Sequence, residues 1–199
     1  MPEVLAAKPA DWPLIFLSGS HNLDGEWRHD FIHYDGYGAC LEAAERFLKS
    51  GGRRFTFLIE ERHMRWTVLN RIRGLWQALA HHAAGEVNPV EVLLWRDAVK
   101  KFDRLLDRAD GSLLIAASPH EITLLSDEAE RRGIDLKRLL PAVGLAAADH
   151  TWSLPQYRFD AGELADGAVT LFVARHRGDR GAFRQVWVPG IKEHFELFP

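Results

Sequence analysis

The sequence predicts a doubly wound α/β fold, in which a parallel sheet carries helices on both faces. Short apolar runs typical of buried strands alternate with segments whose apolar residues recur every three to four positions, the period of an amphipathic helix. That alternating order is the one that builds parallel sheets. The chain of 199 residues is 47% hydrophobic and has no run of Gly or Pro, so scaling predicts that it buries about 70% of its unfolded surface.

The predicted strands are apolar runs bounded by Gly, Pro or charged residues. They span residues 13–17, 54–59, 90–95, 112–117 and 139–145, with a final strand at 184–189. The predicted helices span residues 38–49, 64–82, 97–108, 120–132 and 161–176. On helix 64–82, Trp76 falls on the apolar stripe, so we expect it in the core. Arg71 stands at the edge of the buried face, from which it can reach a cleft.

Composition excludes several classes of function. Lys and Arg total 25 against 28 Asp and Glu, a net charge of -3, which lacks the positive excess that binding to a phosphate backbone demands. The lone Cys40 can form no internal disulfide and suits a reducing compartment. The only apolar run near the start, 13–17, is too short for a secretion signal or a membrane span. We therefore expect a cytoplasmic protein with no membrane partner.

Motifs of common enzyme sites are missing from the sequence. There is no G-x-G-x-x-G after a strand, no G-x-x-x-x-G-K-[ST] and no G-x-S-x-G. His29 and His33 would share a strand face, but no H-E-x-x-H or acidic partner at ligand spacing accompanies them, which favours structural roles over a metal site. His120 and Glu121 begin a helix, where a cap is favoured over catalysis. We predict no enzyme activity, no cofactor and no metal.

Two side chains are candidates for binding a ligand. Trp95 ends a strand at its carboxyl edge, where open α/β sheets bind ligands, and Arg71 can reach that edge from the preceding helix. A purely structural role stays open for both residues. The cationic cluster that begins at Arg175 is interpreted as stabilising the C-terminal end of helix 161–176, with an anion patch as the alternative.

Five stretches in order resemble the effector-binding domain of the LacI/GalR family of bacterial transcription regulators, which has a periplasmic-binding-protein-like fold. Gly38 to Lys49 with GGRRFTFLIEE at 51–61 is similar to the family's helix, Gly-His-Arg-Arg and strand. The other stretches are RIRGLWQAL at 71–79, DGSLLIAAS at 110–118 with EAERRGIDL at 128–136, PAVGL at 141–145, and GELADGAVTLFVARHRG at 162–178 with VWVPGIKEHF at 186–195.

The resemblance implies a small-molecule effector, a sugar or a nucleobase-like metabolite, held between two lobes of a dimeric regulator. By position, Arg71 matches the arginine that reaches the effector, Trp95 a position where an aromatic ring stacks on a sugar, and Ser118 a family Asn. Trp66 and Ala146 complete the predicted ligand-binding set.

Two departures from the family pattern bear on the effector. Pro119 replaces the Asp of Ala-Asn-Asp, and Ala146 replaces the Asp of Gly-Phe-Asp-Asp. Carboxylates hydrogen-bond sugar hydroxyls in pairs, so their loss argues against ordinary sugar recognition. An interaction module that binds no small molecule is therefore kept as an alternative. A small α/β enzyme that uses Arg71, His120 and Glu121 is the second alternative.

The resemblance begins near Trp12, so it implies that this chain lacks the helix-turn-helix head and the earlier strands of the first lobe. Residues 1–34 are expected to be a remnant of the first lobe and crossover, 35–150 the second lobe, and 151–199 a return segment with closing strands. The chain is either an excerpt of a longer regulator or a natural protein reduced mainly to its second lobe, and the sequence leaves both alternatives open. DNA would be bound only through the missing head.

Helix 161–176 carries an apolar stripe, and because most of the first lobe is missing, only strand 13–17 and the last strand are available within this chain to cover it. Its members are Leu164, Ala168, Leu171 and Phe172. Burial of such a stripe is favourable, so we expect a homodimer whose interface includes this helix.

Overall fold

In the computed structural model, the described residues are 13–17, 29–60, 66–82, 90–106, 111–147 and 152–199. The chain divides into two compact units. The first unit contains residues 1–34 and 161–188, and the second contains residues 35–160 and 189–199. The return segment 151–199 is thus divided between the two units.

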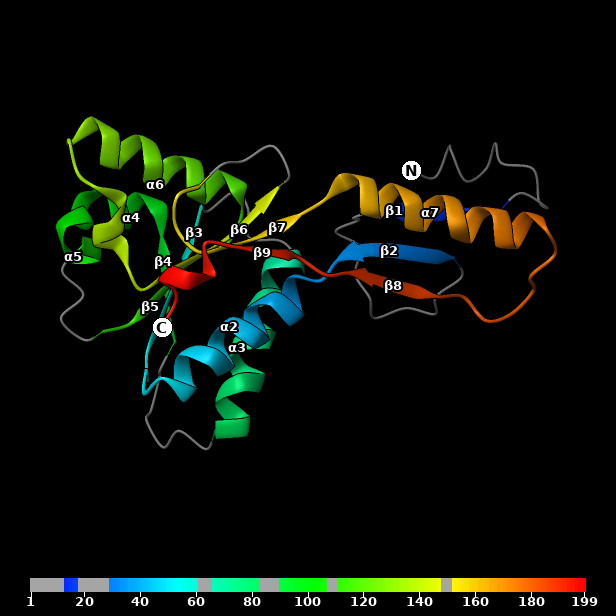
Figure 1. The fold of residues 1–199 in the computed structure, drawn as a ribbon, viewed down its shortest axis with the longest axis horizontal. Helices are drawn as coiled ribbons and strands as arrows, with labels where there is room; N and C mark the ends of the chain where they lie inside the picture. The colour runs from blue at the N-terminus through cyan, green and yellow to red at the C-terminus, as the bar shows by residue number, and fades with distance from the viewer. Residues whose placement is uncertain (1–12, 18–28, 61–65, 83–89, 107–110, 148–151) are drawn as a thin grey trace. The chain divides into compact units, whose positions relative to one another are not determined.

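The second unit is built on a six-stranded sheet with strand order β4-β3-β5-β6-β7-β9 (Figure 1). Its strands are β3 (Phe55–Ile59), β4 (Val90–Leu94), β5 (Leu113–Ala116), β6 (Ala142–Ala147), β7 (Gln156–Phe159) and β9 (Ile191–Glu193). Neighbouring strands run parallel except for β7 and β9, which are antiparallel. In the register, Leu58 of β3 lies opposite both Leu93 and Ala116. Because β3 and β5 are parallel neighbours, their carboxyl ends meet at one edge of the sheet.

Helices cover both faces of this sheet, as the sequence predicts (Figure 1). The helices on one face are α2 (Gly36–Lys49) and α3 (Trp66–His82). The elements on the other face are α4 (Trp95–Ala98), the 3-10 helix η2 (Val99–Lys101), α5 (Phe102–Leu106) and α6 (Pro119–Arg131). Two further 3-10 helices are η3 (Leu136–Leu139) and η4 (Phe195–Leu197).

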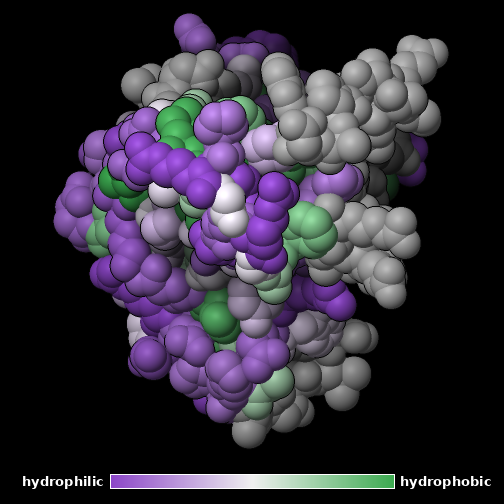
Figure 2. Space-filling view, turned by 90° about the vertical axis from the view of Figure 1, so that its right-hand side faces the viewer, coloured by the Kyte–Doolittle hydropathy of each residue, from purple (hydrophilic) through white to green (hydrophobic). Residues whose placement is uncertain are grey.

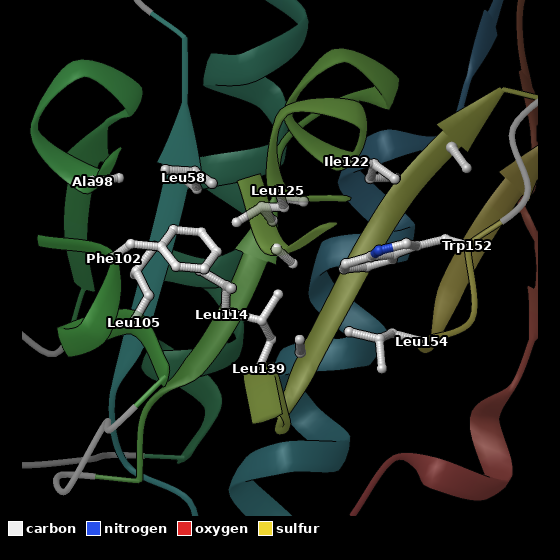
Figure 3. Close-up of a cluster of buried hydrophobic side chains, with 14 residues drawn as sticks. Leu58, Ala98, Phe102, Leu105, Leu114, Ile122, Leu125, Leu139, Trp152 and Leu154 are labelled. Carbon is white, nitrogen blue, oxygen red and sulfur yellow. The ribbon is translucent and has the colours of Figure 1, made fainter. Parts of the chain in front are cut away.

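Successive side chains of each strand point to opposite faces of the sheet, because the strands are pleated. Leu114 of β5 points into the cluster below α4 to α6, where Phe102 and Leu125 pack beside it (Figure 3). On the opposite face, Phe47 of α2 packs edge-on against Phe55 of β3, with ring centroids 5.5 Å apart. Burying such a side chain contributes about 1.5–3 kcal/mol, so these clusters are the main source of stability in the second unit.

The first unit has a three-stranded parallel sheet with the order β1-β2-β8, and α7 packs on it. Its elements are β1 (Ile15–Leu17), β2 (Asp30–Tyr34), α7 (Ala161–His176) and β8 (Gln185–Val188). Leu164 and Leu171 of α7 are buried against Ile32 of β2 and Val188 of β8. Helix 161–176 is therefore confirmed with its predicted bounds.

Ring side chains line up on this sheet. His33 lies between Phe31 and Trp187, with ring centroids 5.6 Å and 5.0 Å away. His29 contacts Phe16, with centroids 5.4 Å apart. Both histidines therefore pack among aromatic rings, as their structural interpretation requires.

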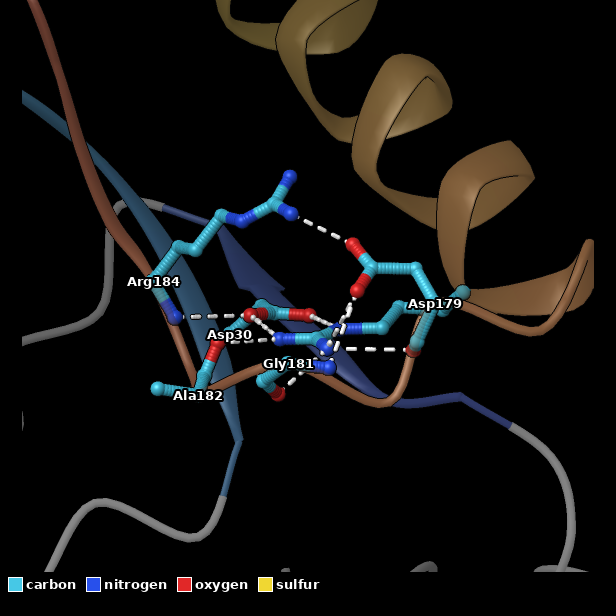
Figure 4. Close-up of polar contacts among 6 residues, drawn as sticks. Asp30, Asp179, Gly181, Ala182 and Arg184 are labelled. Atoms are coloured by element: carbon cyan, nitrogen blue, oxygen red, sulfur yellow. Dashed lines mark hydrogen bonds and ion pairs between the residues drawn. The ribbon is translucent and has the colours of Figure 1, made fainter.

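A charged network joins the start of β2 to the C-terminal end of α7 (Figure 4). Arg175 donates to both carboxylate oxygens of Asp30, over 2.7 and 2.8 Å, and the backbone N–H of Arg184 donates to the same carboxylate over 2.8 Å. Arg175 also donates to the carbonyl oxygens of Asp179, Gly181 and Ala182. The arginine at the end of α7 thus fastens the turn that leads into β8, which favours the structural interpretation of this cluster.

The prediction for Trp76 was wrong, because 48% of its side chain is exposed. The buried stripe of α3 runs through Val68, Leu75 and Leu79, and a residue next to Leu75 is turned by about 100° from that stripe. Helical spacing alone predicts one broad apolar face that includes both Leu75 and Trp76.

The expectation that the stripe on α7 lacks a partner in this chain was also wrong. The sheet covers Leu164 and Leu171, whereas Phe172 is 42% exposed. Val169 and Val173, one turn apart on α7, are exposed as well.

Several element bounds differ from the prediction. Predicted helix 97–108 begins at Trp95 and is broken by η2, and predicted strand 139–145 begins only at Ala142, because η3 precedes it. The prediction omitted β2, β7 and β9, in which polar and charged residues interrupt the apolar pattern. Among the described helices, none is both long and apolar enough to cross a membrane.

Candidate ligand site at the carboxyl ends of the strands

Polar groups gather where β3 and β5 end. Glu60 follows β3, and Ala117 and Ser118 follow β5. The N–H of Ala117 donates to the carbonyl of Leu58, so the sheet pairing continues to this point. Open parallel sheets bind ligands at such an edge, because loops and helix N-termini meet there.

Arg71 reaches this edge from the second turn of α3. Its Nη1 donates to the carbonyl oxygen of Ala117, and its Nε is buried without a hydrogen-bond partner. A Cβ on Gly36 would lie 2.8 Å from that Nε, so the start of α2 leaves room for the arginine only because residue 36 is glycine. Burial lowers the pKa of Arg71, while the nearby Cys40 and Glu121 act in the opposite direction. Arginine nevertheless stays charged in proteins, so the site holds a fixed cation.

Ser118 and Glu121 form the beginning of α6. Ser118 is the N-cap: its hydroxyl accepts from the N–H of His120 over 3.3 Å and donates to Oε2 of Glu121. The Ser-x-x-Glu spacing with Pro119 at the first helical position is the sequence signature of a capped helix start. Here the glutamate reaches beyond its own helix.

Glu121 links α6 to the end of β3. Its Oε1 accepts from the N–H of Glu60 over 2.7 Å, and the residue is 0% exposed. A buried carboxylate is costly unless it is paired, and the charge of Arg71 and the two hydrogen bonds supply that pairing. The site is therefore a buried acid and a partly buried cation joined through Ala117, Ser118 and Glu60.

The structure brings only part of the predicted ligand set together. Arg71 and Ser118 belong to one network, since Arg71 binds the carbonyl that precedes Ser118. Trp95 is partly buried and packs against the cluster below α6, and Ala146 is buried within that cluster. The side chain of Trp66 lies outside the described residues. Sequence reasoning assigned Glu121 only to a cap or a catalytic role, although the Ser-x-x-Glu signature pointed to it.

The one cysteine of the sequence is not an activated nucleophile. Burial raises the pKa of the Cys40 thiol to about 12, so it stays protonated at neutral pH. Within the described part of the chain, no group of three or more His, Cys, Asp or Glu is arranged to hold a metal ion. The arrangement places the guanidinium of Arg71, held by the carbonyl of Ala117, beside the N-cap of α6.

The chain matches no family model and no curated protein sequence. Solved structures do match. A LacI-family transcriptional regulator from Enterococcus faecium with bound ribose has a TM-score of 0.67 at 17% identity, over 91% of this chain and 68% of that one. A LacI transcriptional regulator from Lactobacillus brevis has a TM-score of 0.70 at 15% identity, over 96% of this chain and 72% of that one.

The complex of the transcriptional regulator CelR with cellobiose has a TM-score of 0.63 at 18% identity, over 96% of this chain and 67% of that one. The resemblance to the LacI family is thereby confirmed at the level of the fold. This chain has the α/β fold of LacI-family regulators, with parallel sheets flanked by helices, and spans about 70% of their length.

Proposed function

We propose that this chain is the ligand-sensing domain of a LacI-like transcription regulator and not an enzyme. The observation that carries the proposal is the position of Arg71 at the carboxyl edge of the sheet, beside the N-cap Ser118. A cation and a helix N-terminus at that edge suit a ligand with oxygen or nitrogen acceptors. The fold shared with regulators that hold ribose or cellobiose supports the same reading.

The proposed ligand is a small polar metabolite, a sugar or a nucleobase-like compound. Pro119 and Ala146 offer no carboxylate, and both oxygens of Glu121 are already engaged. Recognition would then rest on Arg71, with Trp95 as a stacking surface and with Ser118 and Trp66 as further members of the site. Ala146 is left out, because it is buried in the cluster below α6. A charge-assisted hydrogen bond from Arg71 contributes about 1.5–3 kcal/mol to binding.

Calorimetry against ribose, cellobiose and adenine tests the proposal with the wild-type chain and the variant Arg71→Ala. We expect one ligand of this kind to bind, and its affinity to fall by at least roughly tenfold in Arg71→Ala. Arg138→Ala, which removes the same charge from an exposed site in η3, is the matched control. Equal affinity in wild type and Arg71→Ala would remove Arg71 from the site.

The second candidate is an interaction module that binds no small molecule. One observation favours it: Arg71 is bonded to Ala117, and Glu121 to Ser118 and Glu60, so the polar groups already have partners within the chain. A ligand must compete with these internal bonds. Absence of heat with every compound, in protein shown to be folded, would favour this second candidate.

We further propose that the protein acts in the cytoplasm as a homodimer and contacts DNA only through a separate helix-turn-helix head. The exposed apolar residues of α7, Val169, Phe172 and Val173, support a dimer contact in the first unit. On the face drawn in Figure 2, hydrophobic side chains lie between hydrophilic ones rather than in one broad patch.

A further inference from the structure

A hollow lies beside α2 and α3, and none of the residues that form the Arg71 network is among its described lining residues. Its volume is about 440 Å³, within the range of small-molecule sites. Its lining residues are Tyr37 of α2 and Asn70, Arg73, Trp76 and Gln77 of α3. Arg71 is not among them, so this hollow is distinct from the site at the carboxyl ends of the strands.

Trp76 gives the hollow an aromatic surface. Trp76 is 48% exposed, whereas Leu75 and Leu79 of the same helix are buried. The exposed indole lies beside a phenol and two carboxamides, so the hollow offers both an aromatic face and hydrogen-bonding groups. The flat face of an indole packs well against the C–H face of a sugar ring.

Gln77 is oriented by a chain of hydrogen bonds that connects the two helices. Nδ1 of His81 donates to Oε1 of Glu45 over 3.0 Å, because a carboxylate can only accept. In the neutral ring, Nε2 of His81 then accepts from Nε2 of Gln77 over 2.8 Å. That arrangement fixes the amide of Gln77 and leaves its oxygen as an acceptor for a ligand. A preorganised acceptor costs less to engage on binding.

The positions of Asn70 and Gln77 on α3 fit an extended ligand better than a single ring. Asn70 and Gln77 lie seven residues apart on one helix, which is a rise of roughly 10 Å. This separation is longer than one nucleobase or one pyranose ring and matches two linked pyranose rings. Carboxamides offer both donors and acceptors, as sugar hydroxyls require. Among the described lining residues there is no carboxylate, so a cationic ligand is not favoured.

We propose that this hollow is a second ligand site, which takes a neutral oligosaccharide of at least two pyranose units stacked on Trp76. Gln77 serves as a positioned acceptor, and His81 holds it in place. Asn70 and Tyr37 supply the remaining hydrogen bonds.

The test is titration of the isotope-labelled chain with maltotriose and with cellotriose, followed by the indole N–H signals in an ¹⁵N–¹H spectrum. The signal of Trp76 is assigned as the one missing in Trp76→Phe. We expect it to shift in a saturable way at millimolar concentrations of one trisaccharide, and glucose to bind at least tenfold more weakly. Trp76→Ala should abolish binding, measured by calorimetry, and His81→Ala should weaken it.

Two controls separate this site from the rest of the molecule. Leu69→Ala changes an exposed residue on the same helix that does not line the hollow, and should leave binding unchanged. Arg138→Ala, a change at an exposed residue of η3, should also leave it unchanged. A Trp76 signal unmoved by both trisaccharides overturns the proposal. Equal affinity in folded Trp76→Ala, or shifts spread over all indole signals, overturns it as well.

Discussion

Asp30 and Arg175 form a two-pronged ion pair in the first unit although 145 positions separate them in the chain. Asp30 is almost completely buried, and Arg175 is only slightly exposed. Burial raises the pKa of Asp30. The hydrogen bonds from Arg175 and from the backbone of Arg184, together with the charges of both arginines, lower the pKa by more than burial raises it, so the pKa of Asp30 lies below its usual value. The pair therefore stays ionised at neutral pH.

Breaking this pair should strongly destabilise the first unit. Asp30→Asn leaves the guanidinium of Arg175 without its counter-charge, and loss of one partner of a buried pair costs about 3–5 kcal/mol. Chemical denaturation followed by fluorescence measures the change. The exposed Arg177→Ala on the following turn should change stability by less than roughly 0.5 kcal/mol. If both variants unfold at the same denaturant concentration, the pair does not fasten α7 to β2.

Acid should destabilise the protein through Glu128 as well as through Asp30. Hydrogen bonds from Arg131 and Arg132 outweigh burial and hold the pKa of Glu128 at about 2. An unfolded glutamate titrates near 4.3, so the unfolded state binds the proton first as pH falls. The contribution of Glu128 is therefore fully present above about pH 5 and is lost progressively toward pH 2. Unfolding curves of wild type and Glu128→Gln should converge over that interval, and a constant difference down to pH 2 would contradict the assignment.

Two helix glycines should respond oppositely to replacement by alanine. A Cβ on Gly74 of α3 would lie 2.4 Å from the carbonyl oxygen of Tyr37, so Gly74→Ala must push α2 and α3 apart. We expect the free energy of unfolding to fall by about 1–3 kcal/mol.

A Cβ on Gly167 of α7 would lie 3.3 Å from Cδ1 of Ile32, a side-chain end that can shift. Gly167→Ala should be neutral or stabilising by up to roughly 1 kcal/mol, because alanine favours the helix.

Loss of the Ser118 hydroxyl should loosen the candidate ligand site. Ser118→Ala removes the N-cap of α6 and one of the hydrogen bonds to Glu121, which costs about 1–2 kcal/mol in thermal unfolding. Ser118→Thr keeps both functions and should restore most of the stability. A threonine variant as unstable as the alanine variant would show that packing, not hydrogen bonding, decides at this position.

A charge on the outer face of α7 should dissociate the proposed dimer. Val169→Glu places a carboxylate among Phe172 and Val173, which disfavours an apolar contact without entering the core. Sedimentation should show a dimer for wild type and a chain of 22.6 kDa for the variant. Thr170→Glu, which is also exposed but lies beside that apolar set, is the control. A monomeric wild-type chain at micromolar concentration would refute the dimer.

Apolar periodicity was enough to predict the six-stranded sheet's central strands, because β3 and β5 are buried on both faces and read as unbroken apolar runs. It failed for β2, where Asp30 and His33 are buried by partners distant in sequence, such as Arg175 and Trp187. Partners that are distant in sequence also limit the prediction of the candidate ligand site. Spacing placed Arg71 at the edge of the buried face, but only the pairing of β3 with β5 reveals that Glu121 reaches the N–H of Glu60.

The division of the first unit between two chain segments has a consequence for synthesis. Phe31 of β2 pairs with Gln185 of β8, and all of residues 35–160 must be made between them. At about 5–20 residues per second, β2 waits roughly 8–30 seconds for its partner strand. During that interval the second unit can already bury most of its core, while Ile32 has neither α7 nor β8 to cover it. The nascent chain therefore offers a chaperone a defined apolar segment for a defined time, and that time is set by the length of the inserted unit.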